Sequence, residues 1–478
     1  MMFSSCWLRT SEGAGSSGGR RTFRLEPKAP GASRSFPQAP VSESRNKGNE
    51  IQLQPTIIPL AWKTVTDSVL NGASTATRAA TDIAAKDRSD GLGGTGLSAS
   101  DGAAEAGVSG RPPIVVICGG KNVGKSTYGR YLVNRLLDRY SAVSYLETDV
   151  GQPEFTAPGL LSLHLLTSPV FGPPSTHMRD PKTSFFYGDV SAKTDPELYL
   201  RCVVALYDEF RRNHYDGAAE GKQLPLVVNT HGWVKGLGLD VLIDILRYTV
   251  PTHVVDVQSA KANKNLPPGN FWETTIEPLS RVHYIPTAVP DQVDASTPFA
   301  HKFAPEERAL RLLAHFQTAT ASGAPPGLAF NENDAYSALA TCLVHHRPFQ
   351  VRLDAVQIYH LHGYVPPEEA LWALNGAVVG LAKAGAEPET GPMPRCLGIG
   401  LVRGIDPARG VLFLVTSLPL AELQGVNTLI QGKVDLPLQL LSAPPFVSPY
   451  LAFNSIAAEG TGSAMVKSRN NIIRKVGD

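Results

Sequence analysis

From about residue 111 onward, short apolar runs alternate with longer segments in which apolar residues recur every three or four positions. The short runs predict buried strands, and the longer segments predict amphipathic helices. The predicted strands cover residues 114–118, 142–149, 224–232, 252–259 and 281–287. The predicted helices cover residues 125–139, 196–215 and 238–250. This alternation predicts an α/β fold whose sheet is mostly parallel and doubly wound, in a domain over residues 111–325.

The pattern is different before this domain. Residues 1–110 are rich in Ser, Gly, Pro and Arg, a composition that cannot bury a core. We therefore expect a largely disordered region and linker, with one or two short helices within residues 57–86. The same Ser- and Arg-rich, acid-poor composition is also typical of organelle transit peptides.

The pattern changes again after the α/β domain. Strand-like segments separated by Gly, Pro and Asp occur at residues 349–363, 396–406 and 410–418. They predict a smaller β-rich C-terminal domain over residues 326–478, which ends in a basic tail.

Charge and cysteine content narrow the classes of function. The formal net charge is only +1 over 478 residues, so any contact with nucleic acid must come from a local basic groove. The five cysteines are scattered without a C-x-x-C pair, which argues against a disulfide framework or a structural zinc site. No apolar run reaches about 18 residues, so we expect no membrane span.

A phosphate-binding motif lies between the first predicted strand and helix. The stretch GGKNVGKST matches G-x-x-x-x-G-K-[ST], in which backbone N–H groups and the helix N-terminus bind phosphates. The lysine of this motif contacts the β- and γ-phosphates, and the following hydroxyl binds Mg²⁺. The motif predicts a nucleoside triphosphate site at Gly119, Gly120, Lys121, Asn122, Val123, Gly124, Lys125, Ser126 and Thr127.

Asp149 ends the second predicted strand, where a P-loop fold keeps its second acid. It could hold Mg²⁺, directly or through water, or accept a proton from an attacking hydroxyl. The alternative is a surface turn, because TDVGQP has the composition of one. A GTPase is a further alternative, but the nearest match to the base-recognising N-K-x-D motif, at residues 263–266, ends in Leu instead of Asp.

Four segments narrow the class further: GGKNVGKST, LETDVGQPEFTAPG, FFYGDVSAKTDPELYL and VVNTHGWVKGLGLDVLIDILR. In this order they strongly resemble the polynucleotide 5′-hydroxyl-kinase family, specifically its nucleolar type, over roughly residues 112–475. The resemblance implies transfer of the ATP γ-phosphate to the 5′-hydroxyl of RNA, and often of DNA. It also implies a nucleolar role in ribosomal RNA processing beside a partner endoribonuclease. The main alternative is an ATP-binding scaffold subunit of an RNA-processing complex that performs no transfer.

The resemblance also assigns roles to residues outside the P-loop. Asp149 matches the proposed general base or metal-site acid, and Gln152 of the same motif would position the metal, water or the 5′ end. Trp233 would stack on a nucleobase, although core packing is the alternative for a tryptophan. The segments that would hold RNA contribute Ser191, Lys193, Asp195, Thr230 and Trp233.

The segment APEERALRLLAHF resembles the arginine-bearing lid of the family, near residues 296–317. Its Arg308 and Arg311 would neutralise charge on the phosphoryl group during transfer. The alternative is an amphipathic helix with a solvated basic face, in which Glu306 and Glu307 pair with these arginines. The expected catalytic set is therefore Lys125, Asp149, Gln152, Arg308 and Arg311, with Ser126 and Asp149 as metal ligands.

Overall fold

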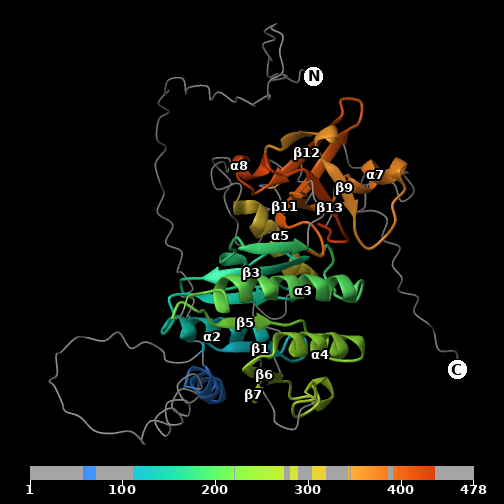
Figure 1. Cartoon of the computed structure of the whole chain (residues 1–478). Coiled ribbons are helices and arrows are strands. Elements are labelled where there is room, and N and C mark those ends of the chain that lie inside the picture. Colours follow the sequence, from blue (N-terminus) through green and yellow to red (C-terminus); the bar gives the residue numbers. More distant parts are fainter. Residues whose placement is uncertain are drawn as a thin grey trace, which may run out of the picture. The chain divides into compact units, whose positions relative to one another are not determined.

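The structure is a computed structural model, and it describes residues 58–71, 111–219, 221–273, 280–288, 304–318, 343, 346–385 and 391–436. It contains a seven-stranded first sheet and a six-stranded second sheet (Figure 1). The predicted α/β class with a separate β-rich C-terminal part is confirmed. The domain boundaries stay predictions, and most of residues 1–110 and the basic tail lie outside the described residues.

The first sheet has the strand order β4-β3-β2-β5-β1-β6-β7. Its five parallel strands match the five predicted ones: β2 (Val143–Glu147), β5 (Leu226–Asn229), β1 (Ile114–Cys118), β6 (His253–Gln258) and β7 (Arg281–Pro286). Two strands without a sequence prediction, β3 (Leu160–Leu166) and β4 (Thr183–Phe186), extend the β2 side in antiparallel fashion. They pair with each other, and the connection between them holds one short helical turn, η1 (Pro174–Thr176), so the alternation of strands with long helices does not predict them.

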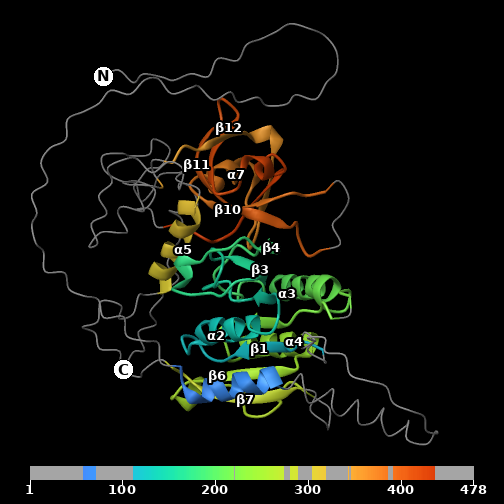
Figure 2. The ribbon, with the colours of Figure 1, turned by 90° about the vertical axis from the view of Figure 1, so that its left-hand side faces the viewer.

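Helices cover both faces of the first sheet, as expected for a doubly wound fold. The residues of β1, β2 and β5 are all buried, as is usual for parallel strands covered on both sides. On one face, α2 (Lys125–Leu137) packs on Val115 and Ile117. On the other face, α3 (Pro196–Phe210) and α4 (Leu237–Thr249) pack with Val116. Figure 2 shows α2 and α4 on opposite sides of β1.

A helix over residues 60–71 adds to the α2 face, within the segment where one or two short helices were predicted. The Trp62 indole N–H donates to the Pro286 carbonyl oxygen at 3.1 Å, and the ring meets Tyr128 of α2 edge-on at 5.3 Å. The Thr66 hydroxyl lies 3.2 Å from the Tyr128 hydroxyl. Figure 2 shows this helix, in blue, beside β6 and β7. The helix over residues 60–71 thus covers apolar side chains of α2, the helix that follows the P-loop.

The second sheet has the order β8-β12-β11-β10-β13-β9, and only its β13–β9 pair is parallel. Its strands are β8 (Phe349–Arg352), β12 (Val411–Thr416), β11 (Cys396–Asp406), β10 (Val378–Ala382), β13 (Thr428–Gln431) and β9 (Gln357–His360). The three segments predicted as strands contain β8, β9, β11 and β12, whereas β10 and β13 were not predicted. Short helical elements are η1 (Pro174–Thr176), η2 (Arg211–Tyr215), η3 (Ala262–Lys264), η5 (Leu353–Ala355), η6 (Pro367–Glu369), α7 (Ala370–Leu374) and α8 (Leu420–Leu423).

The helix α5 (Ala304–Thr318) packs against the second sheet. Its Leu312, Leu313 and Phe316 are buried in one cluster with Ile399 and Val415. The imidazole of His315 lies 2.9 Å from the Ser417 hydroxyl. The sheets also contact one another directly, because the Ser184 hydroxyl donates to the Cys396 carbonyl oxygen at 2.9 Å. Among the described residues, no helix has both the length and the apolar content needed to cross a bilayer.

Candidate active site

The carboxyl ends of four parallel strands meet at one edge of the first sheet. β1 leads into the P-loop, β2 into Asp149 and β5 into residues 230–233, and Asp256 of β6 lies level with Cys118 at the end of β1. Ligands of open α/β sheets bind at such edges. The strand order therefore brings together segments that are up to about 140 residues apart in the sequence.

The P-loop has the backbone shape that its glycines permit. Gly119 has φ +133° and Gly124 has φ +98°, both in the range that favours glycine. A Cβ atom on Gly119 would lie 2.4 Å from the Val257 carbonyl oxygen, so β6 also excludes a side chain there. The α2 N-cap is Gly124, without a side-chain capping bond. The first N–H groups of α2 are therefore available for an anion.

Lys125 is folded back onto this loop. Its ammonium group donates to the Gly120 carbonyl oxygen at 2.9 Å, and the residue is only 7% exposed. Burial lowers the pKa of Lys125, whereas nearby acidic groups, led by Asp149, raise it. The cation thus lies among carboxylates at the sheet edge, within the loop that would bind phosphate.

Sequence reasoning did not single out Glu147, which is fully buried at the end of β2. Its carboxylate accepts hydrogen bonds at 2.9 Å from the N–H groups of Asp149 and Glu154 and from the Asn229 amide. The same Asn229 amide lies 3.3 Å from the Ser126 hydroxyl. Burial and, next, the Asp149 carboxylate raise the pKa of Glu147 to about 8. These hydrogen bonds connect β2, β5 and the P-loop. The feature of the sequence that could have identified Glu147 is an acidic residue at the end of an apolar strand.

Asp149 lies in a turn whose geometry orients its carboxylate. The Oδ1 atom accepts the N–H groups of Gly151 at 3.0 Å and Gln152 at 3.2 Å. Asp149 therefore lies in a turn, as the alternative interpretation expected. This turn is also at the sheet edge where a functional carboxylate was predicted. The Gln152 amide donates to Glu307 of α5 at 2.7 Å, which joins the turn to the predicted lid.

The two lid arginines come to the same edge. Arg311 is only 8% exposed, and its Nη1 lies 3.8 Å from a Glu307 carboxylate oxygen. Burial and, next, Arg311 lower the pKa of Arg308, whereas Asp149 and Asp189 raise it. Arg308 thus lies within electrostatic range of both carboxylates. Arg311 makes the ion pair with Glu307 that the alternative interpretation expected, and the role of both arginines in catalysis stays a prediction.

The two segments predicted to hold RNA meet through one pair of side chains. The Lys193 ammonium nitrogen lies 4.7 Å from the centroid of the half-buried Trp233 ring. A cation over an indole face is attracted by the ring quadrupole. Before Lys193, the Asp189 carboxylate accepts the Thr194 hydroxyl at 2.6 Å and holds the turn. The aromatic face and the ammonium group together suit a nucleobase and a phosphate.

Three other residues of the predicted RNA-binding set serve the local structure. The Thr230 hydroxyl is fully buried and donates to the Ile117 carbonyl oxygen at 2.8 Å. The Asp195 carboxylate caps α3 by accepting the Leu198 N–H at 3.0 Å. The Ser191 hydroxyl accepts the Lys193 N–H at 3.4 Å. Direct RNA contacts by these three stay predictions, and the burial of Thr230 does not favour one there.

His231 is a second residue that sequence reasoning did not single out. It lies between Thr230 and Trp233, is 5% exposed, and its Nδ1 accepts the Trp233 N–H at 3.3 Å. Burial lowers the pKa of His231 to about 4, with opposing smaller effects of Asp149 and Lys125. The imidazole is therefore neutral at neutral pH and lies near both of these groups. In the sequence, only its position between the predicted residues Thr230 and Trp233 pointed to His231.

The oxygen atoms at this edge suit a magnesium ion. Ser126 and Asp149 offer a hydroxyl and a carboxylate, the hard ligands that Mg²⁺ prefers. Within the described ranges, no group of three or more His, Cys, Asp or Glu residues could hold a metal ion. A metal here would therefore depend on nucleotide phosphates and water as well, which is usual for Mg²⁺ in kinases.

Two parts of the chain match known families. Residues 119–302 match the P-loop domain of the mRNA cleavage and polyadenylation factor CLP1, and residues 344–437 match the C-terminal domain of NOL9-like proteins. A solved structure of a wild-type Clp1p–Pcf11p complex is similar to 68% of this chain and 75% of that chain, with 17% identity and a TM-score of 0.48.

Curated relatives match most of the chain. The polynucleotide 5′-hydroxyl-kinase NOL9 of Arabidopsis thaliana is 40% identical over 352 residues, which cover 73% of this chain and 92% of the relative. The proteins of that name from Danio rerio and Homo sapiens are 33% and 32% identical over 75% and 68% of this chain. The chain spans about half the length of these two animal relatives, 51% and 49%.

Proposed function

Because this chain belongs to the NOL9 family of polynucleotide 5′-hydroxyl-kinases, we propose that it transfers the γ-phosphate of ATP to the 5′-hydroxyl end of RNA. One observation supports this most strongly. A P-loop for the phosphate donor and the Lys193–Trp233 pair for the acceptor lie at the same edge of one sheet, together with Asp149. We infer that this edge is the active site.

The donor binds through the P-loop. The N–H groups of residues 119–127 surround the phosphates, and Lys125 exchanges its bond to the Gly120 carbonyl for the β- and γ-phosphate oxygens. Burial strengthens this contact, because a charge excluded from water interacts more strongly with an opposite charge. The Glu147–Asn229 pair holds the Ser126 hydroxyl in place. Ser126, with Asp149 through a water molecule, would hold Mg²⁺, which neutralises phosphate charge when bound, and Asp149 then remains available to accept a proton.

The acceptor RNA enters from the side of Trp233. Its 5′-terminal base stacks on the indole ring, and Lys193 binds a backbone phosphate. Asp149 then accepts the proton of the 5′-hydroxyl while the oxygen forms a bond to the γ-phosphorus and the bond to the bridging oxygen of ADP breaks. Gln152 positions this turn against α5.

The lid arginines act on the transferring group. Arg308 and Arg311 present positive charge close to Asp149, where negative charge spreads over the phosphoryl oxygens during transfer. Glu307 holds both Gln152 and Arg311, so the helix and the catalytic turn are positioned together.

We also propose the cellular role that the family name suggests. The kinase would act in ribosomal RNA processing in the nucleolus, on a 5′-hydroxyl end produced by a partner endoribonuclease. The similarity to NOL9 proteins over most of the chain supports this role. Import of a fusion that carries residues 1–110 into an organelle would contradict it.

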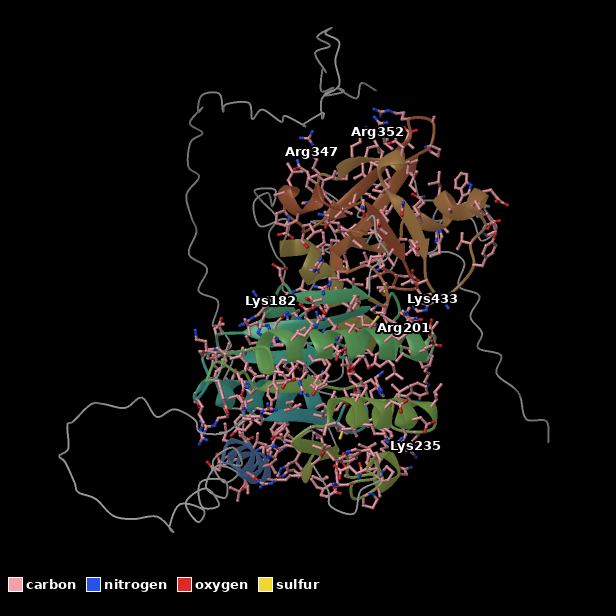
Figure 3. All side chains as sticks on the ribbon, viewed as in Figure 1. Lys182, Arg201, Lys235, Arg347, Arg352 and Lys433 are labelled. Atoms are coloured by element: carbon pink, nitrogen blue, oxygen red, sulfur yellow. The ribbon has the colours of Figure 1, made fainter. Side chains whose placement is uncertain are left out.

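A transfer assay tests the proposed activity. Purified chain with γ-labelled ATP and a 5′-hydroxyl oligoribonucleotide should label the RNA, and Lys125→Ala and Asp149→Asn should abolish labelling. The matched controls Lys182→Ala and Asp180→Asn change exposed residues and should label like wild type. Figure 3 shows Lys182 on the opposite side of the view from Arg201 and Lys433. ATP binding without labelling would favour the scaffold alternative, and preference for GTP in competition would favour a GTPase.

A further inference from the structure

The ring of His231 has one nitrogen whose partner is fixed and one whose partner is missing. The backbone N–H of Trp233 donates to Nδ1 at 3.3 Å, so the hydrogen of the neutral imidazole ring resides on Nε2. Nε2 is buried, and it has no hydrogen-bond partner among the residues that the structure describes. A buried N–H donor without an acceptor is costly and uncommon in native proteins. His231 lies at the edge of the sheet where the substrates are proposed to bind, so a bound substrate can supply this acceptor.

The surroundings of the ring limit what that molecule can be. Lys125 and Asp149 both lie close enough to influence the pKa of His231. The neighbouring Tyr199 ring packs edge-on at 5.8 Å, and its hydroxyl donates to the Thr148 carbonyl at 2.7 Å but makes no hydrogen bond with Nε2. A molecule that contacts Nε2 would therefore also lie near the Lys125 cation and the Asp149 carboxylate.

The backbone keeps His231 close to the P-loop. A Cβ atom added to Gly232 would lie 2.7 Å from the Cα of Lys121, so the segment after β5 touches the loop directly. Trp233 is in turn wedged against Gly238 at the start of α4, because a Cβ atom there would lie 2.3 Å from the indole. The segment that carries His231 is thus fixed between the P-loop and the predicted base-stacking residue Trp233.

Resting on the kinase function proposed above, we propose that the Nε2–H of His231 donates a hydrogen bond to the attacking 5′-hydroxyl oxygen of the acceptor nucleotide. That oxygen has two lone pairs. One forms the bond to the γ-phosphorus, and the other accepts from Nε2, which turns the hydroxyl hydrogen toward Asp149. The hydroxyl proton passes to Asp149, the bond to ADP breaks, and His231 keeps its own proton throughout.

Two substitutions separate donation from packing. His231→Phe keeps a planar ring but removes the donor, and His231→Gln keeps an N–H donor on a flexible chain. With saturating ATP and varied 5′-hydroxyl RNA, the Phe variant should lose about tenfold or more in kcat, since one hydrogen bond to the reacting group is lost. The Gln variant should retain several-fold more activity than the Phe variant. The ATP dissociation constant of both should equal that of wild type.

His253 provides the matched control. It is also buried, its Nε2 also lacks a partner within the described residues, and its Nδ1 pairs with the Thr252 hydroxyl at 2.9 Å. It lies at the amino end of β6, away from the catalytic edge. His253→Gln should therefore match wild type in kcat. Thermal melting checks folding, and His231→Leu replaces the Phe variant if that variant does not fold.

The inference is overturned if His231→Phe has the wild-type kcat, if the Gln and Phe variants lose activity equally, or if the loss lies in ATP binding. The last outcome would mean that Nε2 contacts the phosphate donor instead. Absence of labelling by the wild-type chain would instead defeat the proposed function itself, so the two failures are distinguishable.

Discussion

The proposed donor and acceptor halves of the site are built in different ways. The donor half is one loop of nine consecutive residues, 119–127, whose shape depends on local glycine conformations and on the helix that follows. The acceptor half is assembled from the turn after β2, the segment after β4, the segment after β5 and helix α5. The loop binds phosphate through its own backbone N–H groups, whereas the acceptor half needs four separate segments to come together.

This difference predicts which properties a substitution in each half should change. A change in the P-loop should affect the donor and leave RNA binding intact. A change in the acceptor half should affect RNA binding, catalysis or folding, according to which of its segments is altered. The expectations below test this separation, from the largest effect to the smallest.

Loss of the P-loop lysine should have the largest effect. Lys125→Ala is expected to lower kcat by about a thousandfold or more, because the group that neutralises the transferring phosphate is removed. Binding of a fluorescent 5′-hydroxyl oligoribonucleotide, measured by anisotropy, should stay within about twofold of wild type. An equal loss of RNA affinity would show that the two halves are not separable.

The lid should come next. Arg308→Ala is expected to lower kcat by roughly 100- to 1000-fold with little change in ATP affinity, since the charge acts on the transferring group. Steady-state kinetics with labelled ATP measures this. The control Arg352→Ala removes an exposed arginine of the second sheet, labelled in Figure 3, and should be neutral. A loss confined to KM for ATP would assign Arg308 to the donor half.

The aromatic contact should have an intermediate effect. Trp233→Ala is expected to weaken RNA binding by about 1–3 kcal/mol, the usual value of one stacked base. ATP affinity should be unchanged in the same protein, as measured by calorimetry. Trp372→Ala removes another partly exposed tryptophan, on α7 of the second sheet, and serves as the matched control. Unchanged RNA affinity in Trp233→Ala would favour a packing role for this ring.

The anchoring of α5 should make the acceptor half sensitive to acid. Burial lowers the pKa of His315 to about 4, so between pH 6.5 and 4 the unfolded chain binds a proton that the folded chain does not. This contribution to stability is therefore present above pH 6.5 and is lost as the pH falls, by about 1.4 kcal/mol at pH 5.5. Urea unfolding of wild type and His315→Gln should show a flatter pH dependence in the variant. Identical slopes would exclude His315 as a source.

The smallest effect should distinguish a helix cap from an RNA ligand. Asp195→Ala is expected to lower the free energy of unfolding by about 1 kcal/mol, because α3 loses its N-cap. Asp195→Asn should retain most of the stability, since asparagine caps equally well. RNA affinity should be the same in all three proteins. A selective loss of RNA affinity in the Asn variant would instead support the contact implied by the family resemblance.

Sequence reasoning was sufficient for features that depend on neighbours in the chain. The P-loop and the five parallel strands were predicted because glycine spacing and apolar runs are local signals. Glu147 and His231 were not singled out, because their importance comes from Asn229, Trp233 and the strand order. Thr230 shows what a motif does not reveal, because its hydroxyl donates to the Ile117 carbonyl oxygen inside the sheet, whereas its contact with RNA stays a prediction.

Asn229 shows how tightly one amide can connect distant parts of the chain. Its single NH₂ group contacts both Glu147 oxygens, at 2.9 and 3.2 Å, and the Ser126 hydroxyl at 3.3 Å. Substitutions at these three positions are consequently not independent, because each changes the partner that the others require. We therefore expect epistasis among the three positions, so that the effect of replacing one depends on which residues occupy the other two.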